Sequence, residues 1–297
     1  MMSLNGNRFP LTTSDRLSRA EQADVLCLAA LQLLRDQDDP FDPRWLERWV
    51  DSIWACPYGG VSPVGEGLAI ITPADILGAR ATRAWYRSDL SISAPSGVVD
   101  VWGSGAPVPT AATSTGTKRP AYTESDLTLG GLPSVIFDGA DDQLVDSSVQ
   151  FVIAGTVDFV WMILRQNDWG SGDTVWQTSG GAMLFQTGSS PALSSYSGGT
   201  GISNSSATTS QWFRTIQQFT SSASDYLQIG STKQTGSAGS GGSVLFAPGW
   251  VIGSRWDGSN AWAGAIAEIV EANVNAIPEQ VALLDAYGRA RYPAVGF

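Results

Sequence analysis

The chain has 297 residues, of which 43% are hydrophobic and 15% are charged, so it has ample apolar material for a packed core and is not disordered throughout. Its formal net charge of -11 would repel phosphate backbones and anionic lipids. We therefore expect neither nucleic acid nor a membrane as a partner.

The leading residues 1–78 predict a small helical segment. Ser18 and Glu21 have the spacing of a capping box, and an apolar face follows, which predicts a helix over residues 18–36. Asp42, followed by a proline, has the residue type of a second N-cap. Two such short helices bury little apolar surface alone, so we expect the main domain or a partner protein to cover them, with docking through Leu28, Trp45 and Trp49.

Two features of this leading segment concern the compartment. Cys27 and Cys56 allow a disulfide only in an oxidising compartment, and we favour buried free thiols. Residues 1–8 lack the apolar stretch of a secretory signal. We expect synthesis in the cytoplasm, with any exit by a route other than a cleaved signal.

Residues 79–297 predict a second domain made of strands. Turn-rich segments at 194–209 and 235–243 favour long loops, and residues 278–292 predict an amphipathic helix with Val281, Leu284, Ala286 and Tyr287 facing a sheet. Many short strands followed by one helix indicate a mainly β sandwich of antiparallel sheets. The predicted strands are 83–86, 98–102, 134–137, 156–165, 173–177, 183–187, 212–219, 225–229, 250–253 and 261–271.

Several segments of this domain resemble the LamG-like domains of the concanavalin A-like lectin and glucanase group. They are residues 84–90 (AWYRSDL), 98–105 (VVDVWGSG), 119–122 (RPAY), 132–144 (LPSVIFDGADDQL), 262–270 (WAGAIAEIV) and 284–292 (LDAYGRARY). The resemblance covers about residues 80–297 and implies a jelly-roll sandwich. One departure is that Asp100 precedes Trp102 and no acidic residue takes the usual place after it. Members of this group often bind glycans or serve as structural modules, and they occur in secreted bacterial proteins and in virion proteins of tailed phages.

Catalysis is restricted because the sequence has no histidine, which excludes Ser-His and Cys-His nucleophiles and imidazole zinc sites. Glycoside hydrolases need two carboxylates close together. The nearest pair is Glu268 and Glu271, but a spacing of three on a strand sends the two side chains to opposite faces. We therefore expect a structural role for Glu268 and no catalytic residues in the chain.

An acidic cluster offers the one candidate metal site, for calcium. It consists of Asp138, Asp141 and Asp142, and hard cations require several oxygen ligands. Its spacing is not that of an EF-hand, and acidic residues also satisfy the amides of tight turns. We favour the turn and expect no cofactor. The basic residues Arg80, Arg83, Lys118 and Arg119 are the concentrated positive charges, and they are expected to neutralise nearby acids rather than bind an anion.

Aromatic side chains offer flat apolar faces to sugar rings. The candidates for glycan contact are Trp176, Trp212 and Tyr196. Trp161 is expected in the core instead, because its strand is apolar on both sides and should therefore be covered on both faces.

The resemblance and the signal-free start favour a non-enzymatic, surface-displayed virion protein of a tailed phage, such as a decoration, baseplate or fibre component. Residues 1–75 would dock it to other virion proteins, as a homo-oligomer, and the sandwich would contact host glycans weakly. A bacterial carbohydrate-binding adhesin and a glycoside hydrolase or lyase remain the alternatives.

Overall fold

The computed structural model describes residues 3–4, 7–8, 72–107, 110–148, 157–178, 181–188, 191–198, 200–220, 224–239 and 249–297. The chain divides into two units, Met1–Ile71 and Thr72–Phe297. In the first unit the described residues form two short strands, β1 (Ser3–Leu4) and β2 (Asn7–Arg8), which pair antiparallel. The predicted helices, the cysteines Cys27 and Cys56, and the docking residues Leu28, Trp45 and Trp49 lie outside the described residues.

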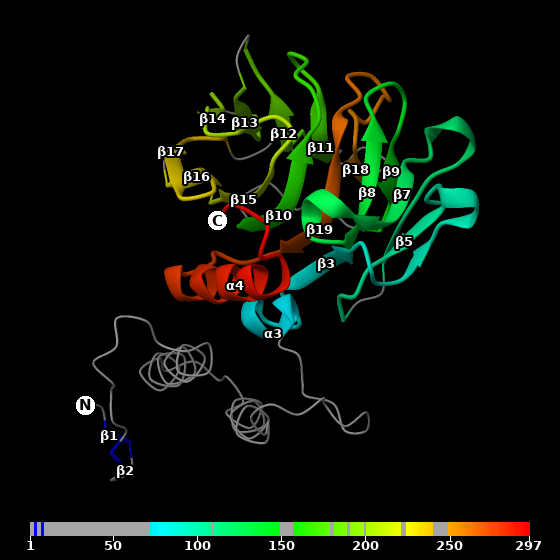
Figure 1. Ribbon diagram of the computed structural model, residues 1–297. Coiled ribbons are helices and arrows are strands. Elements are labelled where there is room, and N and C mark those ends of the chain that lie inside the picture. The colour runs from blue at the N-terminus through cyan, green and yellow to red at the C-terminus, as the bar shows by residue number, and fades with distance from the viewer. Residues whose placement is uncertain are drawn as a thin grey trace, which may run out of the picture. The chain divides into compact units, whose positions relative to one another are not determined.

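The second unit is a β-sandwich of two antiparallel sheets, which confirms the predicted fold class (Figure 1). The eight-stranded sheet has the order β17-β16-β15-β10-β19-β8-β7, and β3 pairs with the remaining part of β19. Its strands are β3 (Thr82–Arg87), β7 (Ala121–Asp126), β8 (Leu132–Asp138), β10 (Asp158–Gln166), β15 (Trp212–Phe219), β16 (Asp225–Ile229), β17 (Thr232–Gly236) and β19 (Ala263–Ala272).

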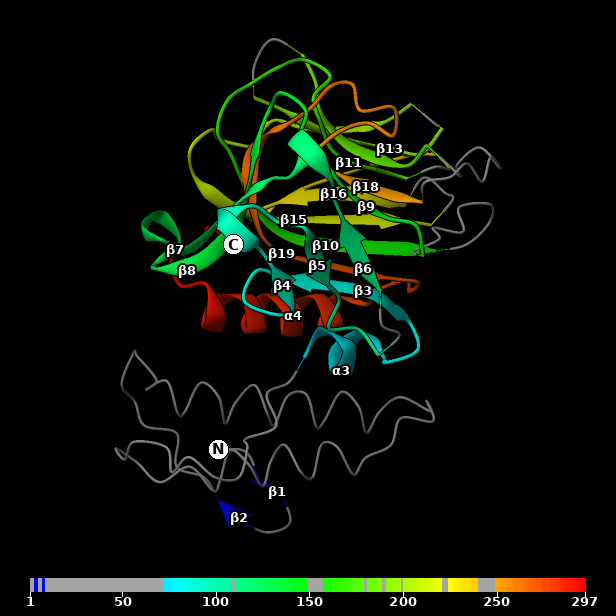
Figure 2. The same cartoon turned by 90° about the vertical axis from the view of Figure 1, so that its right-hand side faces the viewer.

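The nine-stranded sheet has the order β14-β13-β12-β11-β18-β9-β6-β5-β4. Figure 2 shows strands of the two sheets as stacked layers. The strands of the nine-stranded sheet are β4 (Ile92–Ser93), β5 (Val101–Gly103), β6 (Ala111–Thr113), β9 (Leu144–Asp146), β11 (Thr174–Thr178), β12 (Met183–Gln186), β13 (Leu193–Tyr196), β14 (Ile202–Asn204) and β18 (Trp250–Ile252). Three short 3-10 turns lie between strands, at Pro95–Gly97, Gly116–Lys118 and Leu127–Leu129.

Aromatic rings fill much of the space between the sheets. Tyr86 of the eight-stranded sheet lies with its ring centroid 5.6 Å from Trp102 and 6.0 Å from Trp250, both in the nine-stranded sheet. Trp176 meets Trp250 edge-on at 6.0 Å. Each such ring buries a large apolar area, and tilted or edge-on pairs add about 0.5–1.5 kcal/mol beyond that burial. This aromatic layer holds the two sheets together.

Strand β10 is covered on both faces, as its apolar pattern predicted. Val160, Met162 and Leu164 belong to the core between the sheets. Trp161 points to the opposite face, where its ring lies 6.3 Å from that of Tyr287 in the C-terminal helix. Trp161 is fully buried, so its assignment to the core is confirmed.

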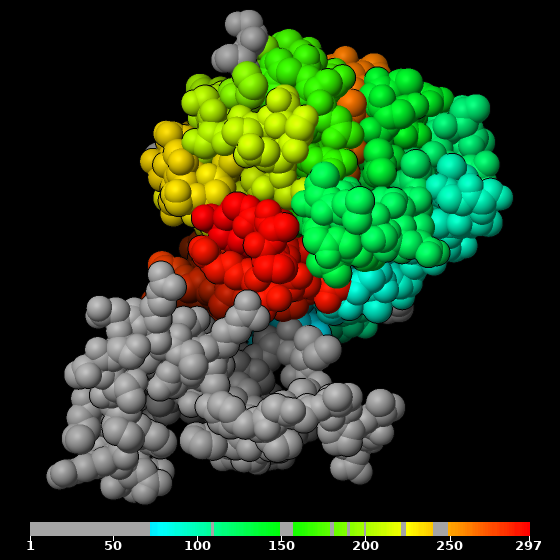
Figure 3. All heavy atoms as spheres, viewed as in Figure 1, coloured from blue at the N-terminus to red at the C-terminus, as the bar shows by residue number. Residues whose placement is uncertain are grey.

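Two helices pack against this face of the eight-stranded sheet. Helix α3 (Pro73–Leu77) begins with a capping box between Thr72 and Asp75. Helix α4 (Pro278–Arg291) matches the predicted helix to within one residue, and Gln280 Nε2 donates a hydrogen bond to Ile76 O of α3 at 3.0 Å. Figure 3 shows the last residues of the chain, in red, at the surface beside β16 and β17. No helix in the described part of the chain is both long and apolar enough to cross a bilayer.

One predicted loop, residues 194–209, proved to be wrong in part. Strands β13 and β14 lie there and form the edge of the nine-stranded sheet, with Ser194 opposite Ser203 and Ser195 opposite Ile202. Serine has weak β propensity, so the sequence pattern favoured a loop. Leu193 and Ile202 supply the inward-facing apolar side chains that fix the hairpin on the sandwich.

Candidate functional site

The aromatic residues predicted to contact sugar do not come together in the structure. Trp176 in β11 is fully buried, and its Nε1 donates a hydrogen bond to Gln217 Oε1 at 2.9 Å. Its ring has no face open to a ligand, so the prediction for Trp176 is wrong. Val175 and Trp176 are both core residues, and the register of β11 shifts between Thr174 and Trp176.

Trp212 lies on the helix-facing side of the eight-stranded sheet and is only 5% exposed. The guanidinium of Arg165 lies 5.1 Å from the ring centroid of Trp212, and Trp212 Nε1 donates to Thr128 Oγ1 at 2.9 Å. Because the protein's own side chains cover the ring, Trp212 does not form a sugar-stacking surface in this structure.

Tyr196 is half-buried on the outer face of the nine-stranded sheet, which is the face pointing away from the core. The strand register runs from Tyr196 to Met183, then to Gln177, and then to Val251. The adjacent row turns the other way, because Leu184, Trp176 and Ile252 are core residues. Alternation therefore points the Tyr196 row outward.

A second outward row lies beside the first and is also polar and aromatic. Ser203 pairs with Ser194, and Ser194 pairs with Phe185. Ser203 is exposed and Phe185 is half-buried. Together the two rows give this end of the outer face hydroxyl groups next to apolar side chains.

An exposed tryptophan stands beside this face. Trp256 lies in the loop between β18 and β19 and is 51% exposed. Its backbone N–H donates to Gln177 Oε1 at 3.1 Å, which fixes the loop next to the outward row. The loop is held further by Asp257, whose Oδ1 accepts bonds from Ser259 N at 3.0 Å and Ser259 Oγ at 2.6 Å.

The size of this area follows from strand spacing. Gln177 and Tyr196 are two strands apart, and neighbouring strands lie about 4.8 Å apart, so their Cα atoms are separated by about 10 Å. We call the area formed by Trp256, Gln177, Met183, Tyr196 and Phe185 the Trp256 face; Gln177 is only 4% exposed and serves as the anchor of the loop, whereas the other four side chains are exposed or half-buried.

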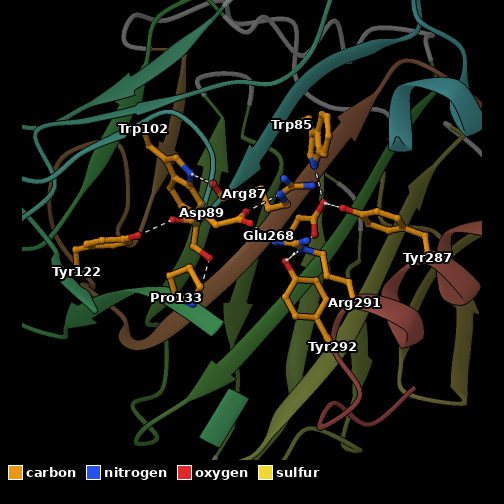
Figure 4. A network of polar contacts seen from close by, with 11 residues as sticks. Trp85, Arg87, Asp89, Trp102, Tyr122, Pro133, Glu268, Tyr287, Arg291 and Tyr292 are labelled. Atoms are coloured by element: carbon orange, nitrogen blue, oxygen red, sulfur yellow. Dashed lines mark hydrogen bonds and ion pairs between the residues drawn. The ribbon is translucent and has the colours of Figure 1, made fainter. Parts of the chain in front are cut away.

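The carboxylates considered for catalysis, Glu268 and Glu271, are engaged in structural contacts. Glu268 in β19 is fully buried and accepts hydrogen bonds from Trp85 Nε1 at 2.5 Å, Tyr287 OH at 2.8 Å and Tyr292 OH at 2.7 Å (Figure 4). Burial raises the pKa of Glu268, and these three donors act in the opposite direction. Glu268 thus ties helix α4 and the residue after it to the sheet.

An ion-pair group on the protein surface lies beside Glu268 in the same network. Asp89 accepts from Arg87 Nε at 2.6 Å and also pairs with Arg291 of α4. These arginines, together with hydrogen bonding, lower the pKa of Asp89 although burial alone would raise it. The pairs make a second link between the helix and the chain after β3.

Glu271 lies on the other face of β19. Its register partner is Ala84, a core residue, whereas the partner of Glu268 is Arg87. The prediction that the two glutamates point to opposite faces is therefore confirmed, and they do not form a catalytic pair. Arg83 pairs with Glu271, with Nε 3.0 Å from Oε1, and also pairs with Asp158.

The group formed by Arg83, Glu271 and Asp158 holds two buried carboxylates and one arginine. Burial raises the pKa of Glu271 to about 8 and that of Asp158 to about 6, against the opposing effect of Arg83. Arg119 similarly pairs with Asp100 at 2.8 Å. Both arginines neutralise local acids, as predicted.

The acidic cluster forms a turn. Asp142 Oδ2 accepts from Asp138 N at 2.8 Å, and Asp138 Oδ1 accepts from Ala140 N at 2.8 Å. Thr117 Oγ1 donates to Asp141 Oδ2 at 2.8 Å. Carboxylate oxygens of all three residues lie within 4.8 Å of one another, which is compatible with a cation, but these turn contacts already occupy several of the oxygens.

Comparisons with known proteins give a fold and no family. No protein-family model matches the chain, and a search of curated sequences finds no match. The binding domain of botulinum neurotoxin serotype D matches with 9% identity and a TM-score of 0.52, over 74% of this chain and 53% of that one. The receptor-binding domain of botulinum neurotoxin mosaic serotype C/D matches with 8% identity and a TM-score of 0.52, over 69% of this chain and 50% of that one. At such identities the likeness shows the β-sandwich fold alone.

Weaker likenesses involve two carbohydrate-active proteins. Trypanosoma rangeli sialidase in complex with sialic acid has 14% identity and a TM-score of 0.48; 86% of this chain is covered, but only 38% of the sialidase. Domain 4 of AbnA, a GH43 extracellular arabinanase from Geobacillus stearothermophilus in complex with arabinotriose, has 15% identity and a TM-score of 0.47, over 69% of this chain and 98% of that domain.

Trp256 is the residue that sequence reasoning missed. The selection of aromatic residues favoured tryptophans in or near predicted strands, where burial is the usual outcome. Trp256 instead precedes Asp257 and Gly258, a turn signal between two strands. A large apolar residue in a polar turn was the signal that could have found it.

Proposed function

We propose that the second unit is a non-catalytic carbohydrate-binding module that holds glycans on the Trp256 face. The observation that carries this proposal is the 51% exposure of Trp256 at an outer face on which Met183, Phe185 and Tyr196 are half-buried and Ser203 is exposed. An exposed indole offers a flat apolar face to a sugar ring, and the neighbouring hydroxyl groups offer donors and acceptors to its hydroxyls.

The non-catalytic part of the proposal is supported by the use of the carboxylates. Glu268 is occupied by three donors, and Glu271 and Asp158 share Arg83 in the interior. A retaining glycosidase needs two carboxyl groups about 5 Å apart on either side of the scissile bond, and an inverting one needs them about 6.5–9.5 Å apart. The fully buried Glu268 and Glu271 face opposite sides of their strand and cannot flank one bond.

The leading segment has its own part in the proposal. Residues 1–75, with Leu28, Trp45 and Trp49, would attach the chain in several copies to other proteins of a larger particle. The sequence resemblance to LamG-like domains, which occur in virion proteins of tailed phages, supports a virion surface as that particle and host glycans as the targets. In this proposal a double substitution, Trp45→Ala with Trp49→Ala, prevents incorporation into purified particles, whereas Trp256→Ala is incorporated normally.

The glycan-binding proposal is tested with the full chain on a glycan array. We expect Trp256→Ala to abolish the signal. Leu127→Ala is the matched control, because Leu127 is the other large hydrophobic side chain exposed in the described part of the chain, at 88%. Both variants should keep the unfolding midpoint of the wild type. Equal binding by wild type and Trp256→Ala, or no bound glycan for the wild type, would overturn the proposal.

A further inference from the structure

Charged residues are distributed unevenly along this chain. The sequence has 28 acidic and 17 basic residues, yet residues 174–213 and 234–254 contain none of them. The first stretch supplies β11, β12, β13 and β14, and the second supplies β18. These five strands are consecutive in the nine-stranded sheet, in the order β14-β13-β12-β11-β18. Half of this sheet is therefore built from uncharged residues alone.

The Trp256 face lies on this uncharged half. Its members Gln177, Met183, Phe185 and Tyr196 all belong to the five strands, and Ser194 and Ser203 continue the face to the edge. The loop that carries Trp256 adds one charge of each sign, Arg255 and Asp257. The hydrogen-bonding groups that this face offers to a ligand are therefore neutral hydroxyls, those of Tyr196 and Ser203, because Ser194 and Gln177 are each only 4% exposed.

This composition selects among ligands. An anionic glycan would approach a protein with a formal net charge of -11 and would find no cation on the five strands to pair with its carboxylates. A carboxylate that loses its water without such a partner carries a large desolvation cost. Neutral sugar hydroxyls instead exchange bonds to water for bonds to the hydroxyls of Ser203 and Tyr196 at little cost.

We infer that the ligand of the Trp256 face is an uncharged polysaccharide segment, an inference that rests on the function proposed above. The serine hydroxyls next to aromatic rings favour this ligand over a second copy of the chain, because the core of a protein interface is rich in large apolar side chains.

The experiment compares polysaccharides that differ only in charge. The probes are polygalacturonate and its fully methyl-esterified form, together with a panel of neutral polysaccharides (dextran, mannan, xylan) and of carboxylated ones. Binding of the full chain is measured at low and at physiological ionic strength. We expect the neutral probes to bind at least about tenfold more tightly than the carboxylated ones, with the largest difference at low salt, where like charges repel most.

A charge variant adds a second readout. Ser203→Lys places a cation on the exposed edge of the uncharged strands and should narrow the neutral-to-carboxylated ratio several-fold. Thr113→Lys is the matched control, because Thr113 is exposed and lies in β6, outside the five strands. It belongs to the same outward row as Gln177, since the register runs from Thr113 to Val145, then to Val251, and then to Gln177. It should change the ratio less.

The outcomes separate this inference from the proposed function. Carboxylated probes that bind as tightly as neutral ones, and lose binding in Trp256→Ala, would overturn the inference and leave glycan binding intact. Absence of binding to every probe would overturn both. A concentration-dependent dimer that Trp256→Ala dissociates would replace the polysaccharide with a second copy of the chain and also overturn the inference.

Discussion

The hydrogen bond from Tyr292 to Glu268 allows a quantitative test of how helix α4 is held. Tyr292→Phe removes one hydroxyl and keeps the ring. In the wild type this hydroxyl donates to Glu268 Oε2 at 2.7 Å, and both residues are buried. Hydrogen bonds to charged groups contribute about 1.5–3 kcal/mol, and the loss leaves a buried carboxylate oxygen without this donor. We therefore expect the free energy of unfolding to fall by about 1.5–3 kcal/mol.

Tyr122→Phe provides the control in the same network. Tyr122 OH donates to a neutral acceptor, Ser88 O, at 3.1 Å, and its side chain is half-buried. The expected loss is about 0.5–1.5 kcal/mol. Urea unfolding of the full chain, followed by tryptophan fluorescence and by circular dichroism, measures both variants. A loss for Tyr292→Phe no larger than that for Tyr122→Phe would refute the reasoning.

A double-mutant cycle tests the assignment to Glu268 directly. Combining Tyr292→Phe with Glu268→Gln should show coupling of about 0.5–3 kcal/mol, because the residues are in contact. Strictly additive effects would mean that the Tyr292 hydroxyl acts through some other group.

Three further predictions follow from single contacts. Gly253 has φ +93°, and a Cβ there would lie 2.2 Å from Phe137 Cδ1, so Gly253→Ala should lower the unfolding midpoint strongly. Gly116→Ala, at φ +65° but with open space around it, adds backbone strain without a clash and should lower the midpoint less. The pKa of Glu271 is raised to about 8 in the folded state, so its contribution to stability is present at low pH and is lost as pH rises from about 4.5 to about 8. Glu271→Gln should lack this pH dependence, so the difference between the unfolding free energies of wild type and variant should change across this range by at most about 1.4 kcal/mol per pH unit. Identical pH profiles would contradict the assignment. Because turn amides and Thr117 already occupy oxygens of Asp138, Asp141 and Asp142, millimolar calcium should leave the unfolding midpoint unchanged, and a rise that Asp141→Asn abolishes would show a calcium site instead.

The sequence was most informative where burial controls the pattern. Strands β15 and β16 were predicted with their observed bounds, and β10 and β19 to within two residues, and nearly all side chains of these four strands are buried. Strands β4, β6, β7, β9 and β17 were missed. They have two to six residues, and pairing with neighbours rather than their own composition defines them.

The candidate site was harder to predict for a physical reason. Alternation tells which residues of a strand share a face, but it does not tell which face is covered. Trp176 and Tyr196 were both reasonable candidates, and only the stacking of the sheets shows that one is buried and the other faces outward. Trp256 reaches the face through a loop, and a loop has no alternating pattern of apolar and polar residues from which its position could be predicted.

Helix α3 connects residues 1–71 to strand β3 of the sandwich, so mechanical tension on the leading residues reaches the sandwich through these two elements. Tension on the leading residues enters the second unit at Thr72 and passes to β3, which is paired along β19. Two polar contacts hold this path: the hydrogen bond from Gln280 to Ile76 O in α3, and the ion pairs of Arg83 with Asp158 and Glu271. Because Tyr86 of β3 belongs to the aromatic layer, tension that reaches this strand acts on the polar contacts and on that layer together.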